Sequence, residues 1–441
     1  MKLNKLIPLS FVALLGLAAC GGGTPSTSQD PTSQDPTSQD PTSQAPAAGT
    51  EITVWATAAE EQVVNAVLEE YNKNSNDADK ISVKFVAVAE GDTGTEVAKD
   101  PGAASAPELF LVADDHIYNL QSKNIVVDLT DVYGEKITAN NTAVSVTSSS
   151  YGGHIYGFPV TSDNGYFLWY NGDEVTAEQA STLEGLLARG RELHKQVLID
   201  NGGWYVPTYF FSPQVCGTES LKFHEDSDGN VVYDINWDNE AGVAAAEYIA
   251  NLYQEYSDVI TTGSNEQIVT GFENDTMIAA ASGTWMENDL KAVCEGLGAT
   301  VLPTYNNGKQ MATFTGTKVY CLNGAKTGAD AQKKLQAAAR LADALTSKEA
   351  QLVRFEKRAA GPCNLEAMED ARYTEHVTMG LKALGDQCAK AAAVQATSAE
   401  GRYWDVGLAI GTALMTSELG EYANWAAFMK GECDILRNPG A

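Results

Sequence analysis

The stretch ITVWATAAEEQVVNAVLEEYNKNSNDADKISVKFV, residues 52–86, contains two predicted strands separated by one predicted helix. The β-branched and aromatic residues at 52–55 are typical of a short strand. Thr57 to Glu60 fits a capping box, and apolar residues then recur at helical spacing from Val63 to Tyr71. Alternation over 81–86 predicts the second strand. This order of elements favours an α/β fold with parallel pairing.

Further segments extend the α/β pattern along the chain. Leu109 to Ala113 reads LFLVA, a continuous apolar run typical of a strand that is covered on both faces. A polar segment at 161–165 predicts a turn or bulge between two aromatic strands. Further helices are predicted at residues 182–199, 239–256, 334–345 and 347–357.

The first twenty residues have the features of an export signal. Lys2 and Lys5 precede an apolar run of signal-peptide length, and Leu17-Ala18-Ala19-Cys20 resembles a bacterial lipobox. We therefore expect residues 1–19 to be a signal peptide and Cys20 to carry the lipid anchor. An ordinary signal peptide followed by a chance cysteine is the alternative. No later segment has 18 uninterrupted apolar residues, so no transmembrane helix is expected.

Residues 20–50 are expected to form a tether. They contain TSQDP three times in succession, followed by TSQAP. Proline breaks helices, and Ser, Thr and Gln bury little apolar surface, so the segment is predicted to be disordered. Two acyl chains hold a protein stably at a membrane, and a tether of this kind would leave the folded part free to reorient.

The composition excludes several classes of function. The chain has 29 Lys+Arg against 58 Asp+Glu, a formal net charge of −29. Nucleic-acid binding needs a basic surface, so no nucleic-acid partner is expected. Six cysteines follow Cys20 without any C-x-x-C spacing, which argues against zinc and thioredoxin motifs. Fifteen disulfide pairings of these six remain open.

Motifs for catalysis and for metal binding are absent. The sequence has no G-x-S-x-G, no H-E-x-x-H and no phosphate loop. The pair Asp114-Asp115 is no evidence for a glycosidase, because 58 carboxylates produce such pairs by chance. HEDSDGN, residues 224–230, lacks the first and last ligands of an EF-hand and predicts a polar hairpin turn instead. We expect no enzyme activity, no metal and no cofactor.

Several phrases, taken in their order along the chain, resemble one family. They are ITVW at 52–55, APELFLVADDHIYNLQSKNIVVDLTD at 106–131, YGGHIYGFPVTSDNGYFLWYNGD at 151–173, GFENDTMIAAASGTW at 271–285, ATVLPTY at 299–305 and LTSKEAQLVRFEKRAAGPCN at 345–364. Together they resemble bacterial extracellular solute-binding proteins of the maltose-binding type, which deliver substrate to ABC importers. In this resemblance, residues 151–173 correspond to the first crossover between lobes and residues 299–305 to the return crossover.

The resemblance implies an α/β fold in the form of a two-lobed, periplasmic-binding-protein-like clamp of type II. Each lobe is expected to be a mainly parallel sheet flanked by helices, and crossovers join the lobes. The N-terminal lobe is expected to comprise residues 51–161 and 305–372, and the C-terminal lobe 162–304 and 373–441. The cleft would hold the ligand, as is common for sites between domains and beyond the carboxyl ends of strands.

The function implied by the resemblance is binding of a carbohydrate, in particular an oligosaccharide, and its delivery to the transmembrane subunits of an ABC permease. We expect a monomer that is lipid-anchored to the outer face of the bacterial cytoplasmic membrane. The alternatives are a surface hydrolase or adhesin with the same tether, and a solute-binding protein for a peptide or a polyamine.

A sugar site needs aromatic platforms and planar polar groups, because sugars present flat C–H faces and hydroxyl groups. Trp285 follows the small residues 282–284 and corresponds to the family's cleft tryptophan. The other candidates by resemblance, each of which has a structural role as its alternative, are Asp115, His116, Asp163, Asn164, Tyr209, Phe210, Gly316, Tyr403 and Trp404.

The sequence also departs from the family pattern. Ala59 and Glu60 occupy the places where the best-known members offer an Asp-Lys pair to sugar hydroxyls, and Val112 matches a common cleft tryptophan. The ligand is therefore not expected to be maltodextrin bound in that manner.

Overall fold

A computed structural model describes residues 49–394 and 402–438 of the chain. The predicted signal peptide, Cys20 and nearly all of the predicted tether lie outside the described residues. None of the helices in the described ranges is both long and apolar enough to span a bilayer.

The first sheet has six strands in the order β17-β16-β3-β1-β2, with β6 paired to β16. Its strands are β1 (Thr50–Ala56), β2 (Ile81–Ala87), β3 (Leu109–Ala113), β6 (Phe158–Gly165), β16 (Thr313–Leu322) and β17 (Ala392–Val394). β1 pairs parallel with both β2 and β3, and α1 (Glu61–Lys73) connects β1 to β2. The predicted strand–helix–strand unit and its parallel pairing are therefore confirmed.

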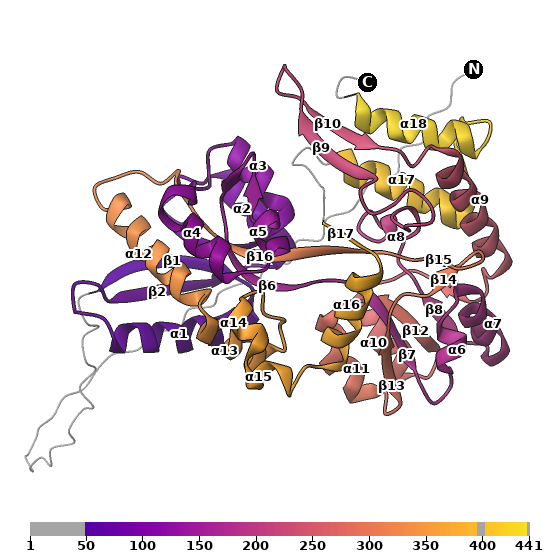
Figure 1. Cartoon of the computed structure of the whole chain (residues 1–441), viewed down its shortest axis with the longest axis horizontal. Helices are drawn as coiled ribbons and strands as arrows, with labels where there is room; N and C mark the ends of the chain where they lie inside the picture. The colour runs from indigo at the N-terminus through magenta and orange to yellow at the C-terminus, as the bar shows by residue number, and fades with distance from the viewer. Residues whose placement is uncertain (1–48, 395–401, 439–441) are drawn as a thin grey trace, which may run out of the picture. The chain divides into compact units, whose positions relative to one another are not determined.

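Helices cover both faces of this sheet (Figure 1). They are α2 (Glu90–Lys99), α3 (Ile117–Ser122), α4 (Thr130–Asn140), α5 (Ala143–Ser148), α12 (Ala331–Leu345), α13 (Lys348–Arg358) and α14 (Leu365–Glu369), together with α1. Leu109 and Leu111 of β3 pack in the cluster that contains α12, whereas Phe110 and Val112 pack in the cluster that contains α2 and α3. β3 is thus covered on both faces, as its continuous apolar run predicts.

The second sheet has five strands in the order β11-β8-β12-β7-β13. Its strands are β7 (Phe167–Asn171), β8 (Gln196–Leu198), β11 (Ile260–Thr261), β12 (Met277–Ser282) and β13 (Leu297–Thr300). β8 pairs parallel with β11 and β12, while β7 pairs antiparallel with β12 and β13. β7 has the opposite direction because it continues almost directly from β6 of the first sheet.

Helices and hairpins surround the second sheet. The helices are α6 (Ala177–Ala180), α7 (Leu183–Leu193), α8 (Pro207–Phe210), α9 (Glu240–Glu255), α10 (Asn265–Glu273), α11 (Glu287–Val293), α16 (Met379–Lys390), α17 (Arg402–Thr416) and α18 (Trp425–Arg437). β9 (Leu221–Glu225) and β10 (Val231–Ile235) form an antiparallel hairpin around the segment 226–230. Asp226 accepts hydrogen bonds from the backbone N–H groups of Asp228 and Asn230 in this turn. The predicted polar hairpin turn is confirmed.

Two paired strands carry the chain between the sheets (Figure 1). β6 ends at Gly165, and β7 begins at Phe167 in the other sheet. β16 runs antiparallel to β6 and also pairs with β3 and β17. Of the turn or bulge predicted at 161–165, the bulge is confirmed: the segment is the end of β6, and the register of its pairing with β16 shifts between Gly316 and Lys318. The return strand is β16, which begins after the predicted segment 299–305.

The helix predicted over 182–199 is replaced by a shorter helix and a strand. The expected helix over 182–199 ends at Leu193, because His194 adopts a left-handed conformation with φ 56°. The chain then enters β8, whose Val197 and Leu198 are buried in the sheet. The helices predicted near 239–256, 334–345 and 347–357 are present as α9, α12 and α13.

A buried ion pair joins the start of α1 to α13. Glu60 is 0% exposed, and its carboxylate lies 3.0 Å from Nε of Arg354. Arg358 makes a second contact with the same carboxylate. Burial alone would raise the pKa of Glu60, but the charges of Arg354 and Arg358 bring it below its ordinary value. The predicted capping box is therefore wrong, because the Glu60 side chain serves this ion pair and the Thr57 hydroxyl has no hydrogen-bond partner in the described part of the chain.

The ion pair predicts a large effect of Arg354→Ala. The change leaves a buried carboxylate with one cation fewer, and removal of one partner of a buried pair costs about 3–5 kcal/mol. We expect a loss of that size in the free energy of unfolding, measured by urea denaturation at pH 7. Lys99→Ala, which removes an exposed ion pair with Glu96, is the control and should leave the midpoint nearly unchanged. Equal midpoints for the two variants would contradict the role of Arg354.

Candidate functional site

A cavity of about 780 Å³ lies between elements of the two sheets. Asp114 and Asp115 line it just after β3, and Ser162 of β6 and Thr315 of β16 line it from the paired crossing strands. α16, β17 and the β9–β10 hairpin also contribute lining residues. The cavity therefore lies at the carboxyl end of a central strand, where ligand sites of α/β sheets are commonly found.

Asp114 is a buried carboxyl group without a counter-ion. It is 7% exposed, and neither of its side-chain oxygens has a hydrogen bond of good geometry to the described residues, although Ser148 and the backbone N–H of Thr317 lie close enough to oppose the rise of its pKa. Burial, followed by the charge of Asp115, raises the pKa of Asp114 to about 8. Burial also raises the pKa of Asp115, whose Oδ1 has no partner among the described residues either. Carboxyl oxygens without a partner keep the capacity to accept hydrogen bonds, and a protonated Asp114 can also donate one.

The structure brings two further predicted residues next to this pair. Asn164 of β6 lies opposite Gly316 of β16 in the register of the two strands. A β-carbon at Gly316 would lie 2.9 Å from Oδ1 of Asp114 and 3.1 Å from Nδ2 of Asn164. Glycine at this position therefore allows the two polar side chains to approach the same point of the crossing strands.

Asp163 and His116 have other neighbours. Asp163 is buried, and its Oδ2 accepts a hydrogen bond from the backbone N–H of Gly361 at 3.2 Å. Gly361 itself lines the cavity, so Asp163 supports the wall from behind. The ring of His116 lies against Gly94 of α2, and His116 does not line the cavity.

Trp285 belongs to a group of aromatic side chains beside the cavity. It is 39% exposed and lies in the short helix η3 (Thr284–Met286), which follows β12. Its ring centroid lies 5.8 Å from that of Trp204, which in turn lies 5.1 Å from that of Tyr205. η3 packs against β6 and α16, two elements that line the cavity, although Trp285 itself does not line it.

Trp204 and Tyr205 were not predicted from the sequence. They follow Gly202 and Gly203 in the loop after β8, beyond the carboxyl end of a strand of the second sheet. The sequence signal that could have identified them is an aromatic pair preceded by two glycines at the carboxyl end of a strand. The predicted Trp404 joins this group, because its ring packs on Gly203 and is partly exposed.

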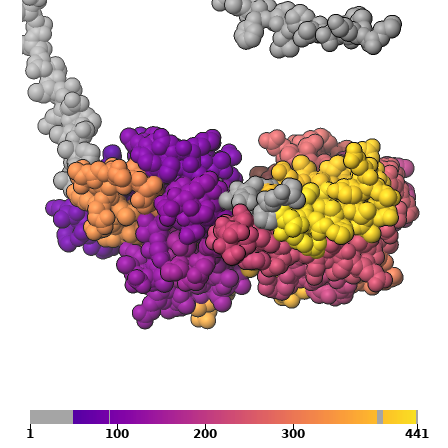
Figure 2. Space-filling view, turned by 90° about the horizontal axis from the view of Figure 1, so that it is seen from above, coloured from indigo at the N-terminus to yellow at the C-terminus, as the bar shows by residue number. Residues whose placement is uncertain are grey.

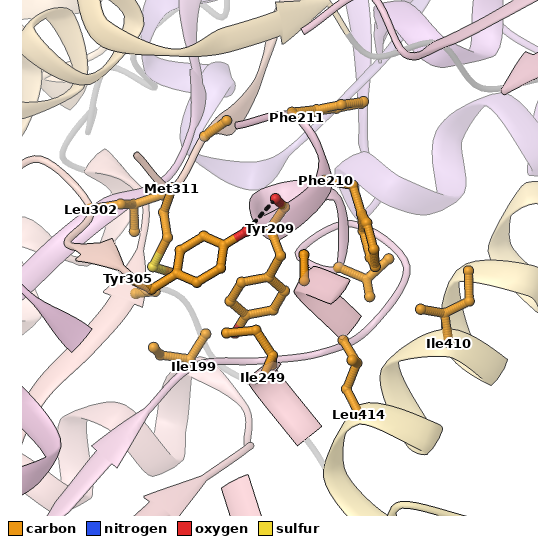
Figure 3. Close-up of a cluster of buried hydrophobic side chains, with 14 of the residues drawn as sticks. Ile199, Tyr209, Phe210, Phe211, Ile249, Leu302, Tyr305, Met311, Ile410 and Leu414 are labelled. Atoms are coloured by element: carbon orange, nitrogen blue, oxygen red, sulfur yellow. Dashed lines mark hydrogen bonds between the residues drawn. The ribbon is translucent and has the colours of Figure 1, made fainter. Parts of the chain in front are cut away.

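Tyr209 and Phe210 lie in the hydrophobic core (Figure 3), as does Tyr403, and all three are 0% exposed. Tyr305 donates a hydrogen bond from its hydroxyl to the backbone carbonyl of Tyr209 at 2.8 Å. Phe210 stacks on Trp237 with centroids 4.7 Å apart. The Tyr403 hydroxyl donates to the carbonyl of Gly203 at 2.6 Å. These side chains support the second lobe from inside and present no surface to a ligand in this structure.

The described residues hold no group of three or more His, Cys, Asp or Glu side chains that could bind a metal ion. All six cysteines after Cys20 are described, and each is a free thiol.

Comparison with known proteins places the chain among binding proteins. Residues 66–380 match the family described as bacterial extracellular solute-binding protein. The chain is 22% identical over 375 residues to the maltooligosaccharide ABC transporter solute-binding lipoprotein of Streptococcus pneumoniae strain R6, covering 83% of this chain and 82% of that protein. It is 21% identical over 328 residues to the galactooligosaccharide-binding protein of Bacillus subtilis, covering 73% of each.

Solved structures support the same architecture. The maltodextrin-binding protein MalE1 from L. casei, solved without ligand, superimposes with a TM-score of 0.73 at 17% identity, covering 88% of this chain and 99% of that chain. At this identity the likeness concerns the fold. The predicted two-lobed clamp of type II is thereby confirmed.

The raised pKa of Asp114 predicts a pH dependence of stability with a definite sign. Between its ordinary value of 3.8 and about 8, the carboxyl group is ionised in the unfolded chain and protonated in the folded protein. Stability contributed by this group therefore falls as pH rises through that window, by up to about 1.4 kcal/mol per pH unit, and levels off above it. The Asp114→Asn variant has no carboxyl group to ionise at this position. Its free energy of unfolding relative to that of the wild type, measured by urea denaturation, should therefore increase from pH 4 to pH 8.

Asp128→Asn provides a control of opposite sign. Burial alone would raise the pKa of Asp128, but hydrogen bonds from Thr130 bring it below its ordinary value. The stability that Asp128 contributes is present above its unfolded pKa and is lost as pH falls through the folded one. The Asp128→Asn variant should therefore differ least from the wild type at low pH. A pH-independent difference for Asp114→Asn would contradict the assignment of an uncompensated buried carboxyl group.

Proposed function

Because this chain belongs to the family of bacterial extracellular solute-binding proteins, we propose that its cavity binds a carbohydrate, in particular an oligosaccharide, for an ABC importer. The observation that carries the proposal is the pair Asp114-Asp115, which lines the cavity and includes three buried side-chain oxygens without a hydrogen-bond partner among the described residues. Two relatives, named for maltooligosaccharides and galactooligosaccharides, support the class of ligand.

The polar chemistry of the cavity suits hydroxyl groups. A buried oxygen without a partner costs free energy, roughly 1–3 kcal/mol for a neutral group and more for a charge. Sugar hydroxyls donate hydrogen bonds to such oxygens and remove this cost on binding. Asn164 adds an amide beside the same point of the crossing strands. Binding energy therefore comes from groups that the protein leaves unsatisfied when the cavity is free of solute.

The aromatic group supplies the second half of a sugar site. Trp285, Trp204 and Trp404 are partly exposed, and large aromatic faces bind the C–H surfaces of sugar rings. A cavity of about 780 Å³ is of the size that holds small-molecule ligands in proteins. The site that we propose comprises Asp114, Asp115, Asn164, Gly316, Trp204, Trp285 and Trp404. We propose no direct ligand contact for Asp163 and His116, which lie next to this site. The buried side chains that support it are Tyr209, Phe210 and Tyr403.

The two lobes are proposed to close on the ligand by rotation about β6 and β16. We propose the boundaries 51–161 with 305–372 for one lobe and 162–304 with 373–441 for the other, except that β17 (Ala392–Val394) pairs in the first sheet and Tyr305 packs in the core of the second lobe. Extended strands between domains absorb the small changes in φ and ψ that such a closure requires. A lipid on Cys20 and the tether of residues 20–50 would hold the monomer near the transmembrane subunits of its permease. The pneumococcal relative, named as an ABC transporter lipoprotein, supports this part.

A thermal-shift panel tests the class of ligand. A solute present at 100 times its dissociation constant stabilises the folded state by about 2.7 kcal/mol. We expect stabilisation by at least one member of a panel of maltooligosaccharides and galactooligosaccharides, and none by di- and tripeptides or polyamines. Stabilisation by a peptide or polyamine alone would assign another solute. Turnover of a sugar without stabilisation would favour the hydrolase alternative.

Trp285→Ala tests the aromatic half of the site. Loss of one stacking surface should weaken the binding of a stabilising sugar by about tenfold, measured by isothermal titration calorimetry. Tyr422→Ala is a matched control, because Tyr422 is 38% exposed and packs on Phe428 of α18, outside the proposed site. Equal affinities for Trp285→Ala and Tyr422→Ala would remove Trp285 from the site.

A further inference from the structure

The β9–β10 hairpin of the second lobe reaches the first lobe beside the cavity. In Figure 2 the crimson surface of the hairpin meets the purple surface of the first lobe. The contact is made with α3 and with β4 (Ser150–Tyr151). Residues from both sides of this contact line the cavity, among them Tyr118 and Tyr151 from the first lobe and Leu221 and Phe223 from the hairpin. The hairpin is therefore a wall of the cavity as well as a contact between lobes.

Three aromatic rings form the contact. Phe223 of β9 lies 5.2 Å from Tyr118 of α3 in an edge-on arrangement and 6.0 Å from Tyr151 of β4 in a stacked one. Tyr118 and Tyr151 lie 4.8 Å apart, edge-on, so each ring touches the other two. Aromatic pairs in such geometries attract each other beyond the effect of their buried area.

A hydrogen bond adds to the ring contacts. The Tyr118 hydroxyl donates to Oε1 of Glu225 at 2.8 Å, across 107 residues of sequence. Phe223 and Glu225 are two residues apart on β9, so the pleat directs both side chains to the same face, toward the first lobe. His224 lies between them on the opposite face, where its Nδ1 is 3.2 Å from Oδ2 of Asp234 on β10.

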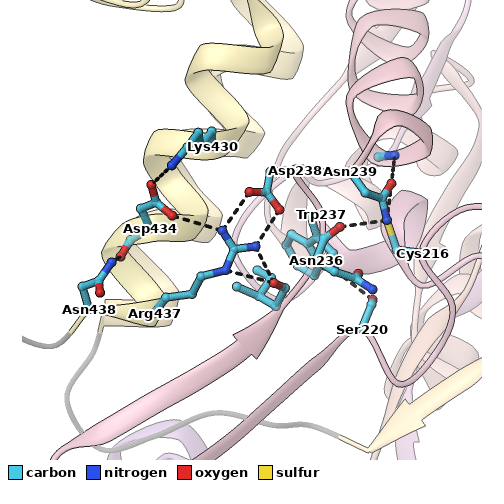
Figure 4. A network of polar contacts seen from close by, with 12 residues as sticks. Cys216, Ser220, Asn236, Trp237, Asp238, Asn239, Lys430, Asp434, Arg437 and Asn438 are labelled. Carbon is cyan, nitrogen blue, oxygen red and sulfur yellow. Dashed lines mark hydrogen bonds and ion pairs between the residues drawn. The ribbon is translucent and has the colours of Figure 1, made fainter.

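The base of the hairpin is held firmly in the second lobe (Figure 4). Arg437 of α18 donates from Nη2 to the carbonyl of Ile235 and to the carboxylate of Asp238, both at 2.6 Å. Trp237 donates from Nε1 to the hydroxyl of Ser220 at 3.0 Å, which ties together the two ends of the hairpin. A hairpin with such a base moves with the second lobe, so its contact with α3 and β4 resists separation of the lobes.

We propose that the β9–β10 hairpin is a clasp between the lobes, in which Phe223, Tyr118 and Tyr151 hold the cavity closed and set the rate at which a bound solute leaves. The solute-retention part rests on the proposed function, whereas the clasp itself does not. Each contact of the clasp must break before the lobes separate along this wall. Weakening the clasp therefore accelerates release more than it changes association, because the contacts are formed in the closed state and absent from the open one.

Hydrogen exchange of the full chain without added solute tests the clasp. Phe223→Ala should increase exchange of the backbone amides of α3, residues 117–122, by about tenfold, although α3 belongs to the other lobe. Tyr118→Phe removes only the hydroxyl and should give a smaller increase in exchange of β9, residues 221–225. His224→Ala is the matched control, because it changes the same strand on the opposite face, and it should leave α3 at the wild-type rate. Unchanged exchange of α3 in Phe223→Ala would overturn the clasp.

Stopped-flow kinetics with maltotriose as the probe test retention. Phe223→Ala should release maltotriose about tenfold faster than the wild type, with the association rate changed less than twofold, and His224→Ala should match the wild type. Equal release rates for Phe223→Ala and the wild type would overturn the role in retention. If the wild type binds no sugar of the panel, the proposed function fails, and the exchange of α3 still decides whether the clasp exists.

Discussion

The pairing of β6 with β16 is the interaction on which the site depends. These two strands carry the chain between the sheets and hold each other by backbone hydrogen bonds. Their register places Asn164 opposite Gly316 and brings both to Asp114 at the end of β3. Ser162 and Thr315, from the same two strands, line the cavity. A shift of one residue in this register would turn these side chains to the other face of the sheet.

Two buried carboxyl groups of the first lobe differ in the charges that surround them. Glu60 is surrounded by Arg354 and Arg358, and its pKa lies below the ordinary value. Asp114 has no such cation, and its pKa rises to about 8. Because two arginines neutralise its charge, the Glu60 carboxylate is part of the framework that fixes α1 against α13. Lack of compensation leaves Asp114 with hydrogen-bonding capacity that a hydroxylated solute can use.

Aromatic residues are divided in a similar way. Tyr209, Phe210 and Tyr403 are buried in one hydrophobic cluster. The Tyr209 hydroxyl hydrogen-bonds with that of Tyr253, and the Tyr403 hydroxyl donates to the backbone carbonyl of Gly203. Trp204, Trp285 and Trp404 lie at the edge of the same lobe and keep part of their rings exposed. Phe223 belongs to a third group, which spans the two lobes with Tyr118 and Tyr151. The first group stabilises the lobe, the second is proposed to meet the solute, and the third is proposed to regulate its release.

The sequence by itself determined the α/β class, the parallel start of the first sheet, the β9–β10 hairpin and the family. These features depend on local periodicity and on the order of motifs, and both can be read from a single sequence. Periodicity did not distinguish a core tyrosine from an exposed one, or place the end of α7 at His194. It also assigned Glu60 to a local cap, because its arginine partners lie 294 and 298 residues away. Burial, counter-ions and contacts between lobes arise only when distant segments meet. The tertiary structure therefore decided which carboxyl groups have a neutralising cation and which aromatic rings are exposed. It also decided that Phe223 reaches Tyr118.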